Sequence, residues 1–182
     1  MSIMATVGDF TYGHDSIQVM TWGEGAELTI GSYCSIAQNV RIFLGGNHRS
    51  DWVSTYPFGH INQNLLGDIK SSGHPATNGD VIIGHDVWIG FGVTIMSGVT
   101  IGSGAIIAAN SHVVTNVSEY EIWGGNPARV IKKRFDLDVI KRLLEISWWD
   151  YPAEKVLLIR TYLSSAPSMS SLLEIENILK SS

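Results

Sequence analysis

Residues 81–117 read VIIGHDVWIGFGVTIMSGVTIGSGAIIAANSHVVTNV, and this stretch decides the fold. An aliphatic residue recurs in it at every sixth position, in the series Ile83, Ile89, Ile95, Ile101, Ile107 and Val113. A second small or β-branched residue follows each of these four positions later, at Val87, Val93, Val99, Ala105, Ser111 and Val117. An earlier tract repeats the pattern at Ile30, Ile36 and Ile42, with Cys34 and Val40 at the fourth offset.

A period of six fits neither the 3.6-residue turn of a helix nor the two-residue alternation of a plain strand. Each unit must therefore contain a short strand and then a corner, so that the chain coils. Three units closing a triangular turn would stack the aliphatic residues into an internal column, with parallel strands about 4.8 Å apart. Gly and Asn at the corners can adopt the left-handed backbone that such bends need. A β-sandwich is the alternative, and two in-phase tracts argue against it.

The repeat is interrupted by residues 44–80, which contain six Gly, three His, Pro57 and Pro75. This segment is too long and too polar to be a simple corner. A long ordered loop in a compact protein usually carries function, so we expect functional residues in it.

Helical spacing begins after Pro127. Apolar residues at helical intervals predict helices over residues 136–148, 153–163 and 168–180. We expect these helices to cover the open end of the coil, because an uncovered strand edge invites aggregation. Residues 1–29 are expected to form short strands at the opposite end. The predicted organisation is a β-coil domain over residues 1–134, including the loop 44–80, followed by a helical cap over residues 135–182.

The composition excludes several classes of protein. Seventeen acidic and twelve basic residues give a formal charge of −5, so we expect no nucleic-acid partner. The single cysteine, Cys34, excludes an intramolecular disulfide framework and a site built from several thiolates. No apolar run approaches the roughly 18 residues that span a bilayer, so we expect no membrane partner. Residues 1–10 lack the basic start and apolar block of a secretory signal, and a cytoplasmic protein is expected.

Two longer motifs add to the repeat: GGNHRSDWVSTYPF over residues 45–58 and GGNPARVIKKRF over residues 124–135. With the six-residue units, they resemble the hexapeptide-repeat acyltransferases. The closer resemblance is to the xenobiotic acetyltransferase subfamily, which includes streptogramin and type B chloramphenicol acetyltransferases and sugar acetyltransferases of surface-polysaccharide pathways. The resemblance covers roughly residues 28–150. It implies a left-handed parallel β-helix, a homotrimer, and acetyl-CoA as donor co-substrate without a required metal.

Acyl transfer from a thioester to an alcohol or amine needs a base that takes the acceptor's proton. His48 is the best candidate, because neutral imidazole accepts a proton near pH 7 and because His48 matches the histidine that this subfamily uses. His74, in a Gly-His-Pro sequence, is the second candidate. The acceptor pocket is expected to include Asn47, Asp51, Trp52 and Tyr56. Alternatively, Trp52, Tyr56 and Phe58 pack the loop onto a neighbouring subunit.

Four of the twelve basic residues lie within six positions, at Arg129, Lys132, Lys133 and Arg134. Such a cluster could hold the phosphates of CoA in an otherwise acidic protein, or it could be a solvated junction between coil and helix. The resemblance favours CoA, with Arg129 and Lys132 as the matching cations and Lys133 beside them. It also implies donor contacts from Trp88, Gly90, Ala108, Ala109 and Thr115. The chain departs from the family at Thr115 and Asn116, where Lys and Asp are common, and at Trp123, where a small residue is usual.

Cys34 occupies an inward position of the repeat, so we expect a buried, inert thiol and direct transfer in a ternary complex. The preferred acceptor is a sugar, because the N-terminal region is short compared with antibiotic-modifying members, and an antibiotic hydroxyl is the alternative. A zinc-dependent carbonic anhydrase is a weaker hypothesis, since His85 and His112 lack the close histidine pair of that family. A non-catalytic trimeric scaffold is the third hypothesis. His14, His60, His85 and His112 are expected to be polar loop, corner or surface residues.

Overall fold

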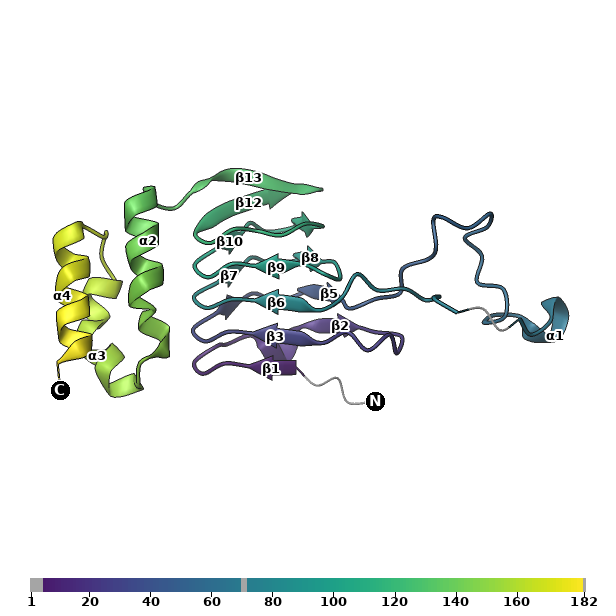
Figure 1. Ribbon diagram of the computed structural model, residues 1–182, viewed down its shortest axis with the longest axis horizontal. Coiled ribbons are helices and arrows are strands. Elements are labelled where there is room, and N and C mark those ends of the chain that lie inside the picture. The colour runs from purple at the N-terminus through teal and green to yellow at the C-terminus, as the bar shows by residue number, and fades with distance from the viewer. Residues whose placement is uncertain (1–4, 70–71, 182) are drawn as a thin grey trace.

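A computed structural model describes residues 5–69 and 72–181, and it contains three sheets (Figure 1). The first sheet consists of β1 (Ala5–Val7), β3 (Leu28–Ile30), β6 (Val81–Ile83) and β9 (Thr100–Ile101). The second consists of β4 (Ser35–Ile36), β7 (Trp88–Ile89), β10 (Ile106–Ile107), β12 (Glu121–Gly125) and β13 (Ala128–Lys133). The third consists of β2 (Gln18–Met20), β5 (Arg41–Phe43), β8 (Thr94–Ile95) and β11 (His112–Val113). All paired strands are parallel except β12 and β13.

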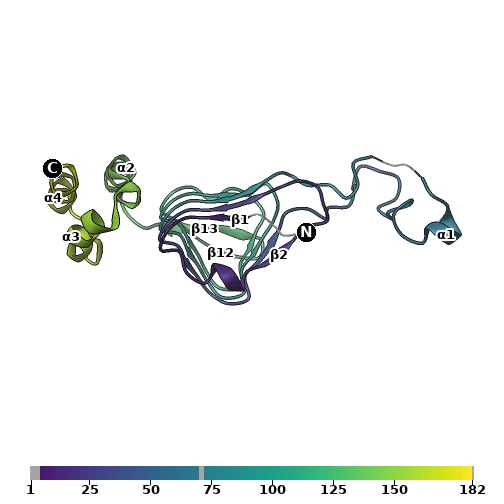
Figure 2. The ribbon, with the colours of Figure 1, turned by 90° about the horizontal axis from the view of Figure 1, so that it is seen from below.

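Consecutive strands of the repeat belong to different sheets, so the chain winds around a triangular coil (Figure 2). The register confirms three units per turn, because Ile83 pairs with Ile101 three units further on. Ile30 pairs with Ile83 across the interruption, which shows that the coil continues in phase on its far side. The three parallel sheets are consistent with the expected left-handed β-helix. The short strands expected within residues 1–29 are present as β1, β2 and β3.

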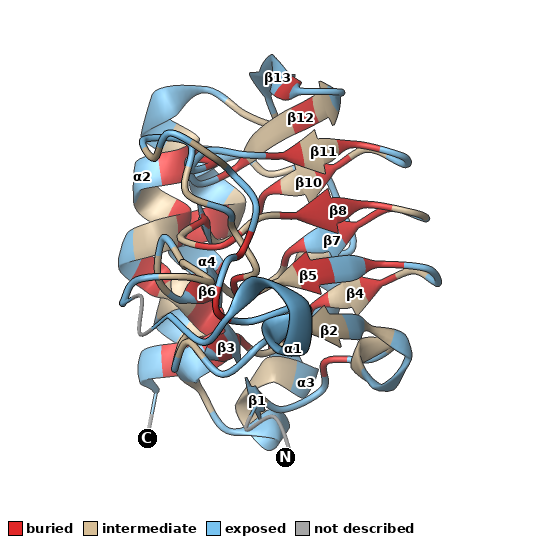
Figure 3. Ribbon diagram, turned by 90° about the vertical axis from the view of Figure 1, so that its right-hand side faces the viewer, coloured by how far each residue is buried: buried red, intermediate tan, exposed pale blue. Residues whose placement is uncertain are grey.

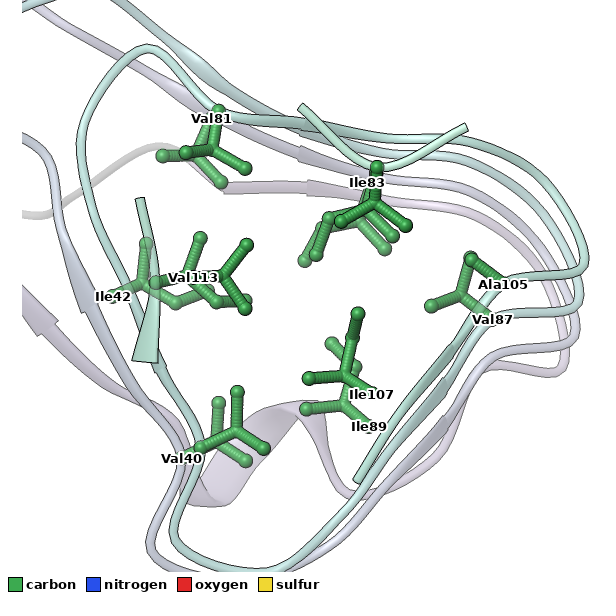
Figure 4. Close-up of a cluster of buried hydrophobic side chains, with 14 of the residues drawn as sticks. Val40, Ile42, Val81, Ile83, Val87, Ile89, Ala105, Ile107 and Val113 are labelled. Atoms are coloured by element: carbon green, nitrogen blue, oxygen red, sulfur yellow. The ribbon is translucent and has the colours of Figure 1, made fainter. Parts of the chain in front are cut away.

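The interior of the coil is filled by the two repeating positions of each unit, whose side chains point inward in stacked columns (Figure 4). Ile83 is 1% exposed, whereas Ile82 beside it on β6 faces outward and is 45% exposed. Cys34 is fully buried in the same core, and burial raises the pKa of its thiol. The burial of Cys34 that its place in the repeat predicts is therefore confirmed.

The corners use the left-handed backbone, as expected, at Gly92 and Asn110. The corner that follows the first sheet differs, because Tyr33, Asp86 and Tyr120 occupy its left-handed positions with φ of 61°, 53° and 55°. Bulky residues pay a steric cost in this region of backbone space, and packing must offset it. Here the Tyr33 ring packs on Trp148, with centroids 4.7 Å apart. We call this edge of the coil the helix-facing corner, and it consists of residues 31–34, 84–87, 102–105 and 118–121.

The three predicted helices are present as α2 (Leu137–Ile146), α3 (Ala153–Leu163) and α4 (Met169–Lys180), and none in the described residues is long and apolar enough to cross a membrane. The expectation that they cover the end of the coil is wrong. They lie beside the coil, as Figures 1 and 2 show. Trp148 and Trp149 of the short 3-10 helix η2 (Trp148–Asp150) join them to the helix-facing corner, and Trp149 stacks on His85 at 5.4 Å. The coil instead ends in the antiparallel pair of β12 and β13.

Between β5 and β6, residues 44–69 and 72–80 project away from the coil, with the short helix α1 (Gln63–Leu66) near their tip (Figure 1). We call residues 44–69 and 72–80 the arm. Figure 3 shows that most of the arm is exposed. Its apolar side chains include Val53, Leu65 and Ile69, which are at least half exposed. The remaining short element, the 3-10 helix η1 (His14–Ser16), lies between β1 and β2.

The alternation along β6 gives a matched pair of substitutions. Ile83→Ala should lower the free energy of unfolding by about 2–5 kcal/mol, because it leaves a cavity in the close-packed coil. Ile82→Ala, one position away on the outer face, should cost less than about 1.5 kcal/mol. Denaturant unfolding followed by circular dichroism measures both. Equal losses from the two substitutions would contradict the inward and outward assignment.

Candidate active site

The turn before His48 is formed by Gly45 and Gly46, and Gly46 has a left-handed backbone with φ of 77°. A Cβ atom on Gly45 would lie 2.3 Å from the carboxylate of Glu24, and one on Gly46 would lie 2.4 Å from the ring of Trp22. The amide N–H groups of Gly46 and Trp22 donate hydrogen bonds to that carboxylate. Burial opposes its ionisation, but these bonds outweigh burial and hold the pKa of Glu24 below its usual value. Sequence analysis missed Glu24 because it lies 22 positions from the glycine it holds.

The base of the arm is fixed by pairing its two ends. The backbone N–H groups of Asn47 and Ala76 each donate to the carbonyl of the other, at 2.9 and 2.8 Å. Ser97 of the coil accepts from the Asn47 side chain and from the backbone N–H of Asn78, both at 3.2 Å. Hydrogen bonds from Asn47 and Asn78 thus hold both ends of the arm on the coil, and His48 directly follows Asn47.

His48 is an exposed residue whose Nδ1 lies 2.7 Å from the backbone carbonyl of Thr55. A carbonyl oxygen only accepts, so Nδ1 must carry the proton in this contact. The neutral ring then presents Nε2 as the nitrogen that can take a proton. This is the tautomer and the exposure that a general base needs.

The second candidate, His74, lies directly against the first. The ring centroids of His48 and His74 are 4.7 Å apart, with the ring planes at 87°. His60 lies on His74 at 5.1 Å, and Trp52 lies 6.4 Å away. Burial, and then the neighbouring His48 and His60, hold the pKa of His74 below its usual value. Backbone pairing in the base of the arm therefore brings together two histidines that are 26 positions apart in the sequence.

The expected acceptor residues are only partly brought together. A depression of about 510 Å³ is lined by Asn47, His48 and Asp51 among others, but not by Trp52 or Tyr56. Asp51 forms a two-point ion pair with Arg49, and this hydrogen bonding lowers the pKa of Asp51 to about 2. Trp52 lies under the Arg49 guanidinium, 5.4 Å from ring centroid to carbon. Tyr56 accepts from Asn62 at 2.8 Å and packs on Phe58 at 4.9 Å, within the arm.

Three of the expected donor residues, Gly90, Ala108 and Ala109, lie at the corner after the second sheet, which we call the donor corner (residues 37–39, 90–92 and 108–110). Thr115 lies at another corner, after β11. Gly90 donates to Ile107 at 2.8 Å, and a Cβ atom at Gly90 would lie 2.6 Å from the amide nitrogen of Ala109. Only glycine therefore permits this close approach of two turns. Trp88 points outward and is 56% exposed, and its strand β7 pairs with β10, which leads into Ala108.

The basic cluster does not stay together. Lys133 pairs with Glu121 at 3.3 Å, and Arg134 pairs with Asp86 of the helix-facing corner, also at 3.3 Å. Arg129 and Lys132 are exposed on β13. Arg129 and Lys132, the two cations that the family resemblance selects, are therefore more available to a ligand than Lys133 and Arg134, which form ion pairs.

The three departures from the family pattern have different surroundings. Thr115 is exposed, and the Asn116 side chain accepts from the backbone of Thr100 at 2.9 Å. Trp123 is 9% exposed, packs in the core of the coil, and donates its indole N–H to Glu121 at 2.8 Å. The large residue at position 123 therefore closes the last turn of the coil.

The other histidines have structural partners. His85 accepts from the Ser32 N–H at 3.0 Å besides stacking on Trp149, and His14 contacts Asp15 at 3.1 Å. His112 lies on the ladder of β11. Within residues 5–69 and 72–181, no three or more His, Cys, Asp or Glu side chains are grouped so as to hold a metal ion.

Comparison with known proteins identifies the family. Residues 80–115 match the model described as bacterial transferase hexapeptide (six repeats). The chain is 42% identical over 163 residues to a chloramphenicol acetyltransferase of Agrobacterium fabrum (strain C58 / ATCC 33970), with 82% of this chain and 77% of the relative covered. The chain is a hexapeptide-repeat acetyltransferase of the xenobiotic subfamily. This xenobiotic-type acetyltransferase is also 44% identical over 138 residues to a probable macrolide acetyltransferase of Lysinibacillus sphaericus, covering 72% and 74% of the two chains.

A solved structure supports the use of acetyl-CoA by this acetyltransferase. The similar structure is a hexapeptide-repeat containing acetyltransferase from Vibrio cholerae O1 biovar eltor, complexed with acetyl coenzyme A. The TM-score is 0.52 at 27% identity, with 72% of this chain and 61% of that chain covered. The protein is accordingly an acetyltransferase that uses acetyl-CoA.

Proposed function

We propose that this protein transfers the acetyl group of acetyl-CoA to a hydroxyl group of an antibiotic or antibiotic-like small molecule, with His48 as general base. One observation carries the proposal: Nδ1 of His48 is committed to the Thr55 carbonyl, which leaves Nε2 for the acceptor's proton. Chloramphenicol and macrolide acetyltransferases among the relatives support an antibiotic acceptor better than the sugar that the sequence favoured. A sugar hydroxyl remains the second candidate.

The reaction follows from this arrangement. Nε2 of His48 takes the proton of the acceptor hydroxyl while the hydroxyl oxygen attacks the thioester carbonyl carbon. The carbon–sulfur bond then breaks, and the proton on His48 passes to the departing thiolate of CoA. The buried Cys34 supports direct transfer, because a thiol sealed in the coil interior reaches neither substrate.

The donor is proposed to lie along the donor corner, with its acetyl end near Trp88 and Gly90 and its pantetheine arm over Ala108, Ala109 and Thr115. Arg129 and Lys132 would hold its phosphates through charge-assisted hydrogen bonds, with Lys133 as a weaker third cation because it pairs with Glu121. Apart from Thr115, these residues lie in or near the second sheet and its corner. Thr115 follows β11 at the corner that the arm also leaves, so it would contact the donor from a neighbouring copy.

A homotrimer is proposed to complete the site. The arm, which carries His48, leaves the coil after β5 and projects away from it, whereas the donor corner follows the second sheet (Figures 1 and 2). Exposed apolar residues on the arm, such as Leu65 at 80%, are well suited to burial on a neighbouring copy. We place the site between the arm of one subunit and the donor corner of the next.

The base is tested by His48→Ala. The substitution should lower kcat about 10²-fold or more, the scale of general-base catalysis, and leave acetyl-CoA affinity nearly unchanged. CoA release with chloramphenicol and a macrolide as acceptors measures kcat, and calorimetry measures donor affinity. Glu174→Ala, at an exposed position of α4 away from the proposed site, is the control and should remain fully active. Near-normal turnover in His48→Ala with collapse in His74→Ala would move the base to His74.

The phosphate site is tested by replacing Arg129 and Lys132 with Ala together. The KM for acetyl-CoA should rise about tenfold or more, since a well-formed charged contact contributes roughly 1.5–3 kcal/mol and solvent reduces this. The effect should shrink in high salt. The control replaces Lys141 and Arg160, which lie on the helices, and changes the charge equally. An unchanged KM and salt dependence in the Arg129, Lys132 variant would require another phosphate site.

The assembly is tested by light scattering after size-exclusion chromatography. A trimer of 19.9 kDa chains has three times that mass, so the measured mass should be about 60 kDa. Leu65→Asp on the arm should shift the population toward monomer and lower activity in parallel. A fully active monomer would refute the shared site.

A further inference from the structure

Both ring nitrogens of His74 are shielded from solvent, and neither has a hydrogen-bond partner within residues 5–69 and 72–181. A buried polar group without a partner is unfavourable and calls for an explanation. Phenylalanine would fill the same space among the rings of His48, His60 and Trp52 without that cost. The packing of the arm therefore accounts for an aromatic ring at position 74 but not for its nitrogens.

The groups around His48 indicate what the nitrogens of His74 could do. Nδ1 of His48 donates to a backbone carbonyl and not to a carboxylate. Asp51, the acid nearest in sequence, is committed to Arg49. Arg49 also lies close to the turn that carries His74, because a Cβ atom on Gly73 would be 3.0 Å from its Nη1. When His48 takes a proton, its positive charge thus forms beside the imidazole of His74 and near a paired guanidinium.

His74 is suited to this situation only as a neutral ring. Burial and the flanking His48 and His60 lower the pKa of His74, which favours its neutral form. A neutral imidazole always has one nitrogen with a free lone pair. The perpendicular contact between the two rings, with centroids at 4.7 Å, places that ring against the base.

We propose that His74 is a positioning residue for His48: it holds the His48 ring edge to face and offers an unprotonated nitrogen to the positive charge that His48 acquires during transfer. The proposal rests on the function proposed above, in which His48 is the base. In this proposal His74 supports His48 as a carboxylate does in other acid–base pairs, but as a neutral group.

The direct test follows the ring resonances of His48 by NMR during a pH titration. His74→Phe keeps a ring of similar size and removes both nitrogens. It should lower the pKa of His48, because the imidazolium loses its electron-rich neighbour, while the Nδ1-protonated tautomer persists. His60→Phe is the matched control, since His60 lies on His74, and should leave the pKa of His48 within error. An unchanged pKa of His48 in His74→Phe would overturn the proposal.

Kinetics supply a second readout. His74→Phe should lower kcat about 5- to 10-fold, the scale of one hydrogen bond, with the KM for acetyl-CoA unchanged. The acid limb of the pH dependence of kcat/KM should move to lower pH together with the NMR value. His74→Gln, which restores a polar group, should recover part of kcat and serves also if His74→Phe does not fold. Full activity in His74→Phe, or a loss as large as that of His48→Ala, would refute a positioning role.

Failure of the underlying function has a separate signature. If the wild-type protein acetylates no acceptor, the proposed function fails, but the titration still shows whether His74 raises the pKa of His48. If the wild type is active and the titration shows no coupling, only the role of His74 is wrong.

Discussion

The stacking of inward-pointing aliphatic residues at every third unit of the repeat is the constraint on which the structure depends. Ile83 lies over Ile30 and under Ile101, and the parallel ladder allows no shift of this register without turning apolar side chains outward. Because each turn must close in three strands, the chain has three corners at fixed positions. The arm leaves the coil at one of these corners, and the segment between α2 and α3 packs on another.

Each corner carries a different feature of the molecule. The helix-facing corner accepts strained, bulky residues because Trp148 and Trp149 pack on it. The donor corner is narrow, with Gly90 and Ala109 in close approach, and leaves an exposed strip beside Trp88. The remaining corner releases the arm. The ladder thereby fixes the distance between the donor corner and the base of the arm within one chain. The hydrogen bonds of Asn47 to Ala76 and Ser97 then fix the backbone next to His48.

The sequence predicted most of the fold because the coil and the helices depend on local periodicity. The position of the helices was not predictable in this way, since it depends on contacts such as Tyr33 with Trp148, which are 115 positions apart. At the site, the motif around His48 led to the residue that we propose as the base. The contacts of His48 with Thr55 and of Gly46 with Glu24 were not predicted, because they form only on folding and no spacing marks them. His74 was singled out only as a rival base, and its contact with His48 was not predicted. The basic cluster looked continuous in sequence, yet ion pairs with Glu121 and Asp86 divide it.

The central claim is that the arm of one subunit meets the donor corner of another. Mixing two inactive variants tests it most directly: His48→Ala, which lacks the base, and Ala109→Trp, which fills the proposed donor groove. After dissociation and random reassembly in equal amounts, the whole population of trimers should regain about a quarter of the wild-type activity, because that share of sites pairs an intact base with an intact groove. Activity no greater than that of the separate variants would contradict a site shared between subunits.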